Sequence, residues 1–413
     1  MISTDVIILG GGAAGMFAAA VLAEEAPWLQ VLVLEKGAMP LAKVRVTGGG
    51  RCNVTHACAD VLNFAQQYPR GGRELIGPLN RFGPAETVAW FETHGVPLVT
   101  RDDGCVFPRS DTSEDIIHAL LAASGAGHVK IRTRAEGSSV RPVEGGVEVT
   151  LVNGEPLFGR KLLVATGGGA CVKGLGHTIE SCVPSLFTFN TPDMAFAALA
   201  GMVVDAVQVG VGKCKADGAL LITHSGVSGP AVLRLSSLGA RTLAELNYQF
   251  AMKINWLPGQ SAEESVEWLG KQRAVSPRKQ VGTWSPLGLS ARLWKLLVSR
   301  AEVDESREWA ACSSKTFRQI AAQVHGFTLP VSGKNPHREE FVTCGGIRLK
   351  EVNFKTLESR LVPGLYFAGE VLDVDAQTGG FNLQAAWTTG FLAAQAIIGA
   401  DVGFPHVGSE RPL

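Results

Sequence analysis

The chain has 413 residues, with 38 Lys and Arg against 38 Asp and Glu, so its formal net charge is zero. This length provides for a full hydrophobic core and two or three domains, while zero net charge disfavours a global attraction to nucleic acid or to an anionic membrane. The 49 glycines and the positive mean hydropathy are typical of a large α/β enzyme.

The first apolar run is not expected to be a signal peptide. No basic segment precedes it, and the glycines at 10–12 interrupt it. No membrane span is expected either, because no uninterrupted apolar run approaches the length of about 18 residues that a span needs. The eight cysteines form no C-x-x-C pair, so the sequence predicts no metal site and no redox disulfide. Scattered thiols suit a reducing compartment, and we expect a cytoplasmic protein.

The start of the chain has the layout of a dinucleotide-binding βαβ unit. A strand-like run leads into glycines and an alanine-rich helix, and a second strand over 31–34 ends in Glu35. Gly10 permits the tight turn, Gly12 lets a pyrophosphate approach the backbone, and Gly15 lets the helix pack on the sheet. Glu35 is placed to accept hydrogen bonds from an adenosine ribose. The pattern alone does not distinguish FAD from NAD, and an ordinary strand-to-helix turn is the competing interpretation.

Beyond this unit the hydrophobic pattern predicts further helices and strands. In chain order they are helices at 85–93 and 113–123, a small antiparallel meander at 129–152, a strand at 161–166, strands at 202–211, 219–223 and 248–256, helices at 289–298 and 316–324, strands at 341–349 and 364–369, and a closing apolar helix at 383–398. No second G-x-G-x-x-G opens a helix, so a separate NAD(P)H domain is not predicted.

The simplest α/β arrangement of these elements is one nucleotide-binding domain built from both ends of the chain. Its parts are residues 1–188 and 336–413, and the insertion between them covers 189–335. The insertion is expected to be β-rich over about 189–258 and helical over about 259–325.

Three further segments favour a flavin. The segment 43–55 combines three consecutive glycines with Lys43, Arg45 and Arg51, cations that suit phosphate or the negative charge of a reduced flavin. The segment 165–168 follows a strand and can cross a cofactor, and Glu370 ends a later strand where its carboxylate can bind a ribityl hydroxyl. Each segment alone has an ordinary reading as a turn, but their joint order favours a flavin site.

With these residues in view, the chain resembles the BaiN/YhiN-like bacterial flavoproteins, which belong to the superfamily of FAD-dependent oxidoreductases with a glutathione-reductase-like FAD domain. The segments that carry the resemblance are GGGAAG (10–15), TGGGRCNVTH (47–56), GCVFPRS (104–110), LLVATGG (162–168), GALLITHSGVSGPAVL (218–233) and the block 343–390. The resemblance implies one non-covalent FAD in a Rossmann-like domain, with an inserted β-barrel-like plus helical region. It also implies flavin-dependent reduction, including that of an enone in dehydrogenated bile acids.

The resemblance further implies where the cofactor lies. The pyrophosphate is expected at Gly10, Gly12, Ala14 and Gly15, and the adenosine at Glu35 and Lys36. The residues expected to border the flavin are Lys43, Arg51, Cys52, Asn53 and Val54. Thr166 and Gly167 are expected to cross the flavin, and the residues expected to close its site are Gly369, Glu370, Asn382 and Leu383. Asp373 and Asp375 are alternatively expected to support the loop after Glu370. The chain departs from the family after Gly168, where members carry a longer stretch.

A flavin reductase needs few catalytic side chains, because the cofactor moves the hydride. Cys52 beside Arg51 is a candidate acid or nucleophile with a lowered pKa, and a cysteine that merely packs on the flavin is the competing interpretation. His224, on a polar loop after a strand, is a candidate proton donor or anion ligand, or else a residue that stabilises a turn.

Three functions follow from these observations. The first is an FAD-dependent oxidoreductase that reduces a small organic substrate, with unsaturated compounds among the candidates and with NADH, NADPH or an electron-donor protein as reductant. The second is a flavoprotein that acts on or binds RNA or another macromolecule. Arg-rich stretches at 70–81 and 271–278 favour it, but zero net charge and a lack of interleaved aromatic and basic residues make nucleic acid an unexpected partner. The third is a degenerate member with little turnover, which the departure after Gly168 suggests.

Overall fold

The predicted βαβ unit is present at the start of the chain. In the computed structural model, which describes residues 2–167, 174–335 and 342–401, β1 (Ile2–Leu9), α1 (Ala13–Glu25) and β2 (Val31–Leu34) follow one another. Strands β1 and β2 pair in parallel, with Val6 opposite Val31. All four residues of β2 are buried, as expected of a parallel strand covered on both faces.

Both ends of the chain contribute to one central sheet. The order is β19-β20-β21-β9-β1-β2-β6, and β6, β2, β1, β9 and β21 pair with their neighbours in parallel. The added strands are β6 (Val129–Arg132), β9 (Pro156–Val164), β19 (Val352–Asn353), β20 (Glu358–Ser359) and β21 (Leu365–Phe367). Strands β7 (Gly137–Val143) and β8 (Gly146–Leu151) form a hairpin beside β9. The antiparallel meander expected at 129–152 is therefore right for β7 and β8 and wrong for β6, which pairs in parallel with β2.

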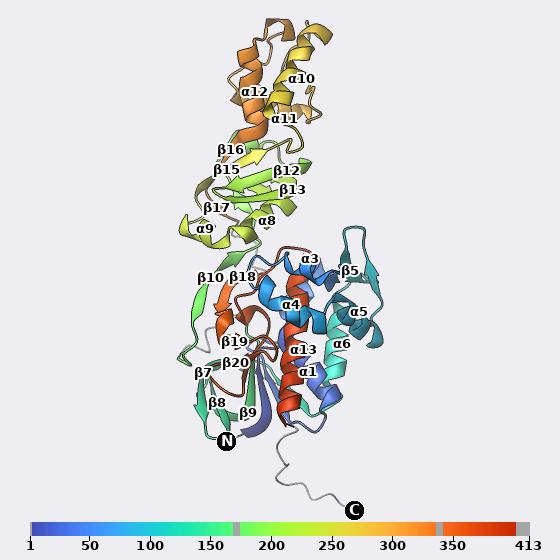
Figure 1. Ribbon diagram of the computed structural model, residues 1–413, viewed down its shortest axis with the longest axis vertical. Coiled ribbons are helices and arrows are strands. Elements are labelled where there is room, and N and C mark those ends of the chain that lie inside the picture. Colours follow the sequence, from blue (N-terminus) through green and yellow to red (C-terminus); the bar gives the residue numbers. More distant parts are fainter. Residues whose placement is uncertain (1, 168–173, 336–341, 402–413) are drawn as a thin grey trace, which may run out of the picture. The chain divides into compact units, whose positions relative to one another are not determined.

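The closing helix α13 (Phe381–Asp401) packs along α1, as Figure 1 shows. The two helices approach closely at Gly390, where a Cβ atom would lie 2.6 Å from the backbone oxygen of Ala14. The expectation that the two ends of the chain form one Rossmann-type domain is thus confirmed.

The chain divides into two units, residues 1–183 with 341–413, and residues 184–340. The remaining elements of the first unit include α2 (Ala42–Gly50), β3 (Thr55–His56), α3 (Val61–Ala65), α4 (Gly72–Arg81), α5 (Pro84–Thr93), β4 (Leu98–Thr100), β5 (Cys105–Pro108), α6 (Glu114–Ser124), β18 (Val342–Ile347) and the short 3₁₀ helix η4 (Gly369–Val371). Strand β10 (Ile179–Ser185) pairs with β18. Helix α4 was missed because its glycines and Pro78 indicate a loop, yet it forms since Leu75, Pro78 and Leu79 share a buried face.

The second unit is built on a seven-stranded sheet in the order β16-β15-β12-β13-β14-β11-β17. Its strands are β11 (Phe189–Asn190), β12 (Val203–Val211), β13 (Cys214–Thr223), β14 (Gly226–Ser228), β15 (Phe250–Asn255), β16 (Phe327–Val331) and β17 (Gly333–Lys334). Its helices are α7 (Met194–Ala197), α8 (Pro230–Leu238), α9 (Ala240–Glu245), α10 (Ala262–Val275), α11 (Ala291–Arg300) and α12 (Ser314–Gly326). Trp256, Trp294 and Trp309 are fully buried in its core. None of the helices described in either unit combines the length and hydropathy of a membrane span.

Candidate functional site

The glycines between β1 and α1 have two different physical roles. Gly10 has φ +105° and a Cβ atom there would lie 2.3 Å from the backbone oxygen of Ala165, while a Cβ on Gly15 would lie 2.0 Å from the oxygen of Gly10. These two glycines are therefore required by packing. At Gly12, in contrast, a Cβ would have no atom within 4 Å, and no side chain caps α1 there. The helix N-terminus is thus accessible to an anion, as a pyrophosphate site requires.

Glu35 holds the loop that surrounds this helix N-terminus. One carboxylate oxygen accepts the N–H of Gly11 at 2.8 Å and the other accepts the N–H of Gly37 at 2.6 Å. Each oxygen keeps a further lone pair with which to bind ribose hydroxyls. The sequence suggested only the ribose contact, because the link to Gly11 depends on the tertiary fold. Lys36, beside it, is exposed.

Two side chains and the backbone of a third, distant segment meet at the carboxyl edge of the sheet. Lys43 Nζ of α2 lies 3.2 Å from Glu370 Oε2, and a Cβ on Gly167 would lie 3.5 Å from the same oxygen. Ligands of open parallel sheets bind at this edge. The Lys43 side chain is 70% exposed, so the ion pair adds little stability, and its importance is the charge it places there.

Burial contradicts the lowered pKa expected for Cys52. Its side chain is fully buried, its backbone has φ +57°, and burial raises the pKa of its thiol to about 12. Arg51 is exposed, and its Nε donates to the backbone oxygen of Gly48 at 3.0 Å. The thiol is therefore protonated at neutral pH, which supports a packing role rather than a nucleophilic one.

We expect Cys52 to resist thiol reagents at pH 8. A pKa near 12 leaves a negligible thiolate fraction there, and the reagent cannot reach a buried sulfur. Cys182 is exposed and serves as the internal reference. Alkylation of the native protein followed by peptide mass spectrometry should label Cys182 and leave Cys52 unmodified; equal labelling would contradict the burial.

Two buried polar atoms lie near the start of α13. Asn53 Oδ1 and His56 Nδ1 have no hydrogen-bond partner among the described residues. Cβ atoms on Gly380 and Gly379 would lie 2.8 Å and 3.5 Å from them, and the His56 ring stacks on Phe381 with 4.8 Å between the centroids. Unpaired buried polar atoms are uncommon in folded proteins and here suggest a missing ligand group. Together with the open N-terminus of α1, they show that the residues present fit a dinucleotide. His56 is not among the residues predicted to hold the cofactor.

Other predicted contacts are engaged within the protein. Asn382 Oδ1 accepts the N–H of Ala376 at 2.9 Å, and its Nδ2 donates to the oxygen of Ala376 at 3.1 Å. The buried Val54 donates its N–H to Val106 and accepts from Trp387 Nε1. The side chain of Asn382 and the backbone of Val54 therefore support the loops of the site.

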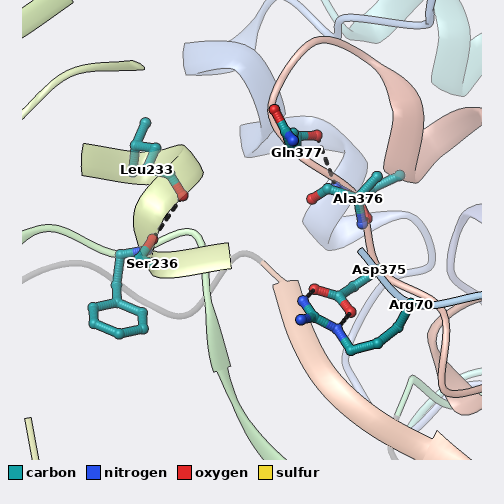
Figure 2. A network of polar contacts seen from close by, with 8 residues as sticks. Arg70, Leu233, Ser236, Asp375, Ala376 and Gln377 are labelled. Atoms are coloured by element: carbon teal, nitrogen blue, oxygen red, sulfur yellow. Dashed lines mark hydrogen bonds and ion pairs between the residues drawn. The ribbon is translucent and has the colours of Figure 1, made fainter. Parts of the chain in front are cut away.

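A buried ion pair supports the loop that follows Glu370. The Arg70 guanidinium faces the carboxylate of Asp375 and donates to both of its oxygens, as Figure 2 shows. The side chain of Asp375 is fully buried. This agrees with the alternative role predicted for Asp375.

Among the remaining predicted site residues, His224 lies in the second unit, and three others differ in their burial. His224 belongs to the second unit, at the exposed turn between β13 and β14, so its catalytic role stays a prediction. Ala14 is buried, Leu383 is half-buried and Thr166 is exposed. The departure from the family after Gly168 falls on 168–173, outside the described residues.

Comparison with known proteins places this geometry in a family. The model of the HI0933-like protein Rossmann domain matches residues 4–396. The Ribosomal RNA dihydrouridine synthase of Escherichia coli is 30% identical over 96% of this chain and 98% of its own. The 3-dehydro-bile acid delta(4,6)-reductase of Clostridium scindens is 28% identical over 94% of this chain and 98% of its own. Among solved structures, the FrdA chain of Escherichia coli quinol fumarate reductase aligns with a TM-score of 0.51 at 14% identity, over 98% of this chain and 72% of its own, a similarity of fold alone.

Proposed function

We propose that this chain, which belongs to the HI0933-like family, is an FAD-dependent oxidoreductase that reduces a carbon–carbon double bond conjugated to a carbonyl group. The observation that carries the FAD-dependent part of the proposal is the open N-terminus of α1 at Gly12, next to Glu35 and to the Lys43–Glu370 pair. Together they provide an anion site, ribose acceptors and a cation at one edge of a parallel sheet.

The names of the two relatives support one chemistry. A dihydrouridine synthase saturates the ring double bond of uracil, which is conjugated to a ring carbonyl. A 3-dehydro-bile acid delta(4,6)-reductase acts on double bonds conjugated to a ring ketone. Reduction of such a conjugated double bond adds a hydride to the carbon distant from the carbonyl and a proton to the adjacent carbon, and we propose this reaction for the present chain.

The residues of the chain bind and orient the reactants. The N–H groups at Gly12 and the α1 dipole hold the pyrophosphate, Glu35 accepts from the ribose, and Asn53 and His56 offer polar atoms at the start of α13. A bound FAD supplies the hydride transfer that side chains cannot perform. The Lys43 ammonium stabilises negative charge that develops at the sheet edge.

NADH or NADPH is the proposed reductant, with an electron-donor protein as the alternative. The described cysteines form no disulfide with one another, which supports the cytoplasmic location that we propose.

An anaerobic half-reaction experiment tests this function. We expect the purified full chain to bind FAD with the blue and near-ultraviolet absorbance of oxidised flavin, and NADH, NADPH or dithionite to bleach it. Addition of a cyclic enone or of uridine-containing RNA without oxygen should restore the colour and give a product heavier by two hydrogens in mass spectrometry. Protein that stays colourless in excess FAD would overturn the cofactor, and reduced flavin that neither substrate reoxidises would overturn the reaction.

A further inference from the structure

The second unit differs in charge from the first. Residues 184–340 contain 17 Lys and Arg against 13 Asp and Glu, whereas the first unit contains 21 against 25. The excess is concentrated between Trp268 and Ala301, where no acidic residue occurs. The basic residues of that stretch are Lys271, Arg273, Arg278, Lys279, Arg292, Lys295 and Arg300. A neutral chain therefore contains a strongly basic segment.

Exposed tryptophans accompany these cations. Trp268 on α10 and Trp284 in the connection to α11 are 42% and 45% exposed, although a tryptophan is usually mostly buried. Lys279 Nζ lies 5.4 Å from the centre of the Trp284 ring, a cation–π contact. We define the tryptophan–basic surface as Trp268, Lys271, Arg273, Arg278, Lys279 and Trp284, carried by the end of α10 and by its connection to α11 (Figure 1).

Several of the cations on this surface lack an acidic partner. Lys271 pairs with Glu267 at 2.9 Å in an exposed contact. Within the part of the chain that the structure describes, Arg273, Arg278 and Lys279 form no ion pair.

The fold places Glu305 and Glu308 beside the connection between α10 and α11, through backbone contacts with Gly282 and Gln280, and the Glu305 carboxylate pairs with Lys295. Among the described side chains, Arg273, Arg278 and Lys279 are paired with neither acid, so their charges are available to a polyanion, and the two exposed indole rings are available for stacking. The sequence was expected to lack interleaved aromatic and basic residues, and the exposed Trp268 and Trp284 beside these cations correct that expectation.

We propose that the tryptophan–basic surface binds single-stranded RNA. Phosphates would pair with Arg273, Arg278 and Lys279, and unpaired bases would stack on the indole rings, the two interactions that define single-strand binding surfaces. An anionic bilayer would require a continuous apolar face, but α10 places the charged Glu267 and Lys271 around Trp268. This inference rests on the proposed function, because the uracil ring contains the conjugated double bond that the enzyme would reduce.

Charge reversal of the surface tests the inference. The probe is a fluorescein-labelled single-stranded RNA of about 20 nucleotides, long enough for one such surface, and binding to the full chain is followed by fluorescence anisotropy. We expect Arg278→Glu/Lys279→Glu to weaken binding at least about tenfold at low salt, and Trp284→Ala about tenfold through lost stacking. The logarithm of the wild-type affinity should fall with the logarithm of salt concentration with a slope of about 2, as three phosphate contacts predict.

A matched variant separates a local effect from net charge. Lys213→Glu/Lys215→Glu makes the same charge change at exposed positions of the same unit and should bind RNA within about twofold of wild type, because the lost cations lie outside the surface. All variants should keep wild-type flavin content, melting temperature and enone reduction.

Three results would overturn RNA binding by this surface. RNA binding could weaken equally in both double variants, or stay unchanged in Arg278→Glu/Lys279→Glu. The wild-type protein could also bind phosphatidylserine vesicles but not RNA. Retained enone reduction in these cases would leave the proposed function intact. Conversely, a protein that binds RNA but whose reduced flavin reduces no substrate would overturn the proposed function instead.

Discussion

Replacing Gly12 by Val should abolish tight FAD binding while leaving the fold intact. A Cβ at Gly12 meets no atom within 4 Å, and the residue has φ −83°, which valine adopts readily. The free energy of unfolding of the FAD-free protein should therefore change by less than about 1 kcal/mol. The added side chain would occupy the space through which a pyrophosphate reaches the α1 N–H groups. Losing two charge-assisted hydrogen bonds, each of about 1.5–3 kcal/mol, weakens binding at least about 100-fold.

Quenching of flavin fluorescence during titration gives the FAD dissociation constant. Thermal unfolding without FAD gives the melting temperature, which reports the stability of the fold. Gly10→Ala is the informative control, because there a Cβ would lie 2.3 Å from the Ala165 oxygen and φ is +105°. It should lower the melting temperature of the FAD-free protein, and Gly12→Val should not. Wild-type FAD affinity in Gly12→Val would show that the pyrophosphate does not bind at the N-terminus of α1.

The contrast between these two glycines shows what the sequence predicts well. A strand, a glycine turn and a helix are adjacent in the chain, so their spacing alone predicts the turn at Gly10 and the close packing at Gly15. The same local signal predicted α13 as an apolar helix, and pairing of β21 with β9 confirmed that both chain ends share one sheet.

The parts that were missed depend on contacts between distant segments. The neighbouring Arg51 suggested a lowered pKa for Cys52, against a competing interpretation as a packing residue, and burial by the surrounding fold raises that pKa to about 12. Strand β6 was grouped with the hairpin that follows it, whereas its partner is β2, about a hundred residues earlier. Asn382 is predicted to close the cofactor site, and its contact with the cofactor stays a prediction, but no sequence pattern indicated that its side-chain amide binds the backbone of Ala376. A pattern of residue types contains no information on which partner satisfies a polar group.

Breaking the ion pair between Arg70 and Asp375 is expected to cause the largest loss in the free energy of unfolding. Arg70→Met removes the cation and leaves the carboxylate of Asp375 fully buried without its charge partner. Breaking a buried pair from one side costs about 3–5 kcal/mol, because the remaining carboxylate loses its guanidinium partner at a site that water does not reach. We expect urea unfolding followed by circular dichroism to show this loss, and Arg141→Met to cost less than about 1 kcal/mol, since the side chain of Arg141 is 69% exposed in its pair with Glu148.

The double variant Arg70→Met/Asp375→Leu distinguishes a structural pair from a functional one. Replacing both charges by apolar groups of similar size should recover most of the stability, because no buried charge remains. If the pair only stabilises the fold, the double variant should also recover FAD affinity. If the pair positions the loop that Asn382 holds through Ala376 at the start of α13, stability should return while FAD binding stays weak. A double variant no more stable than Arg70→Met would show that the cost lies in lost packing of the Arg70 side chain rather than in the buried charge.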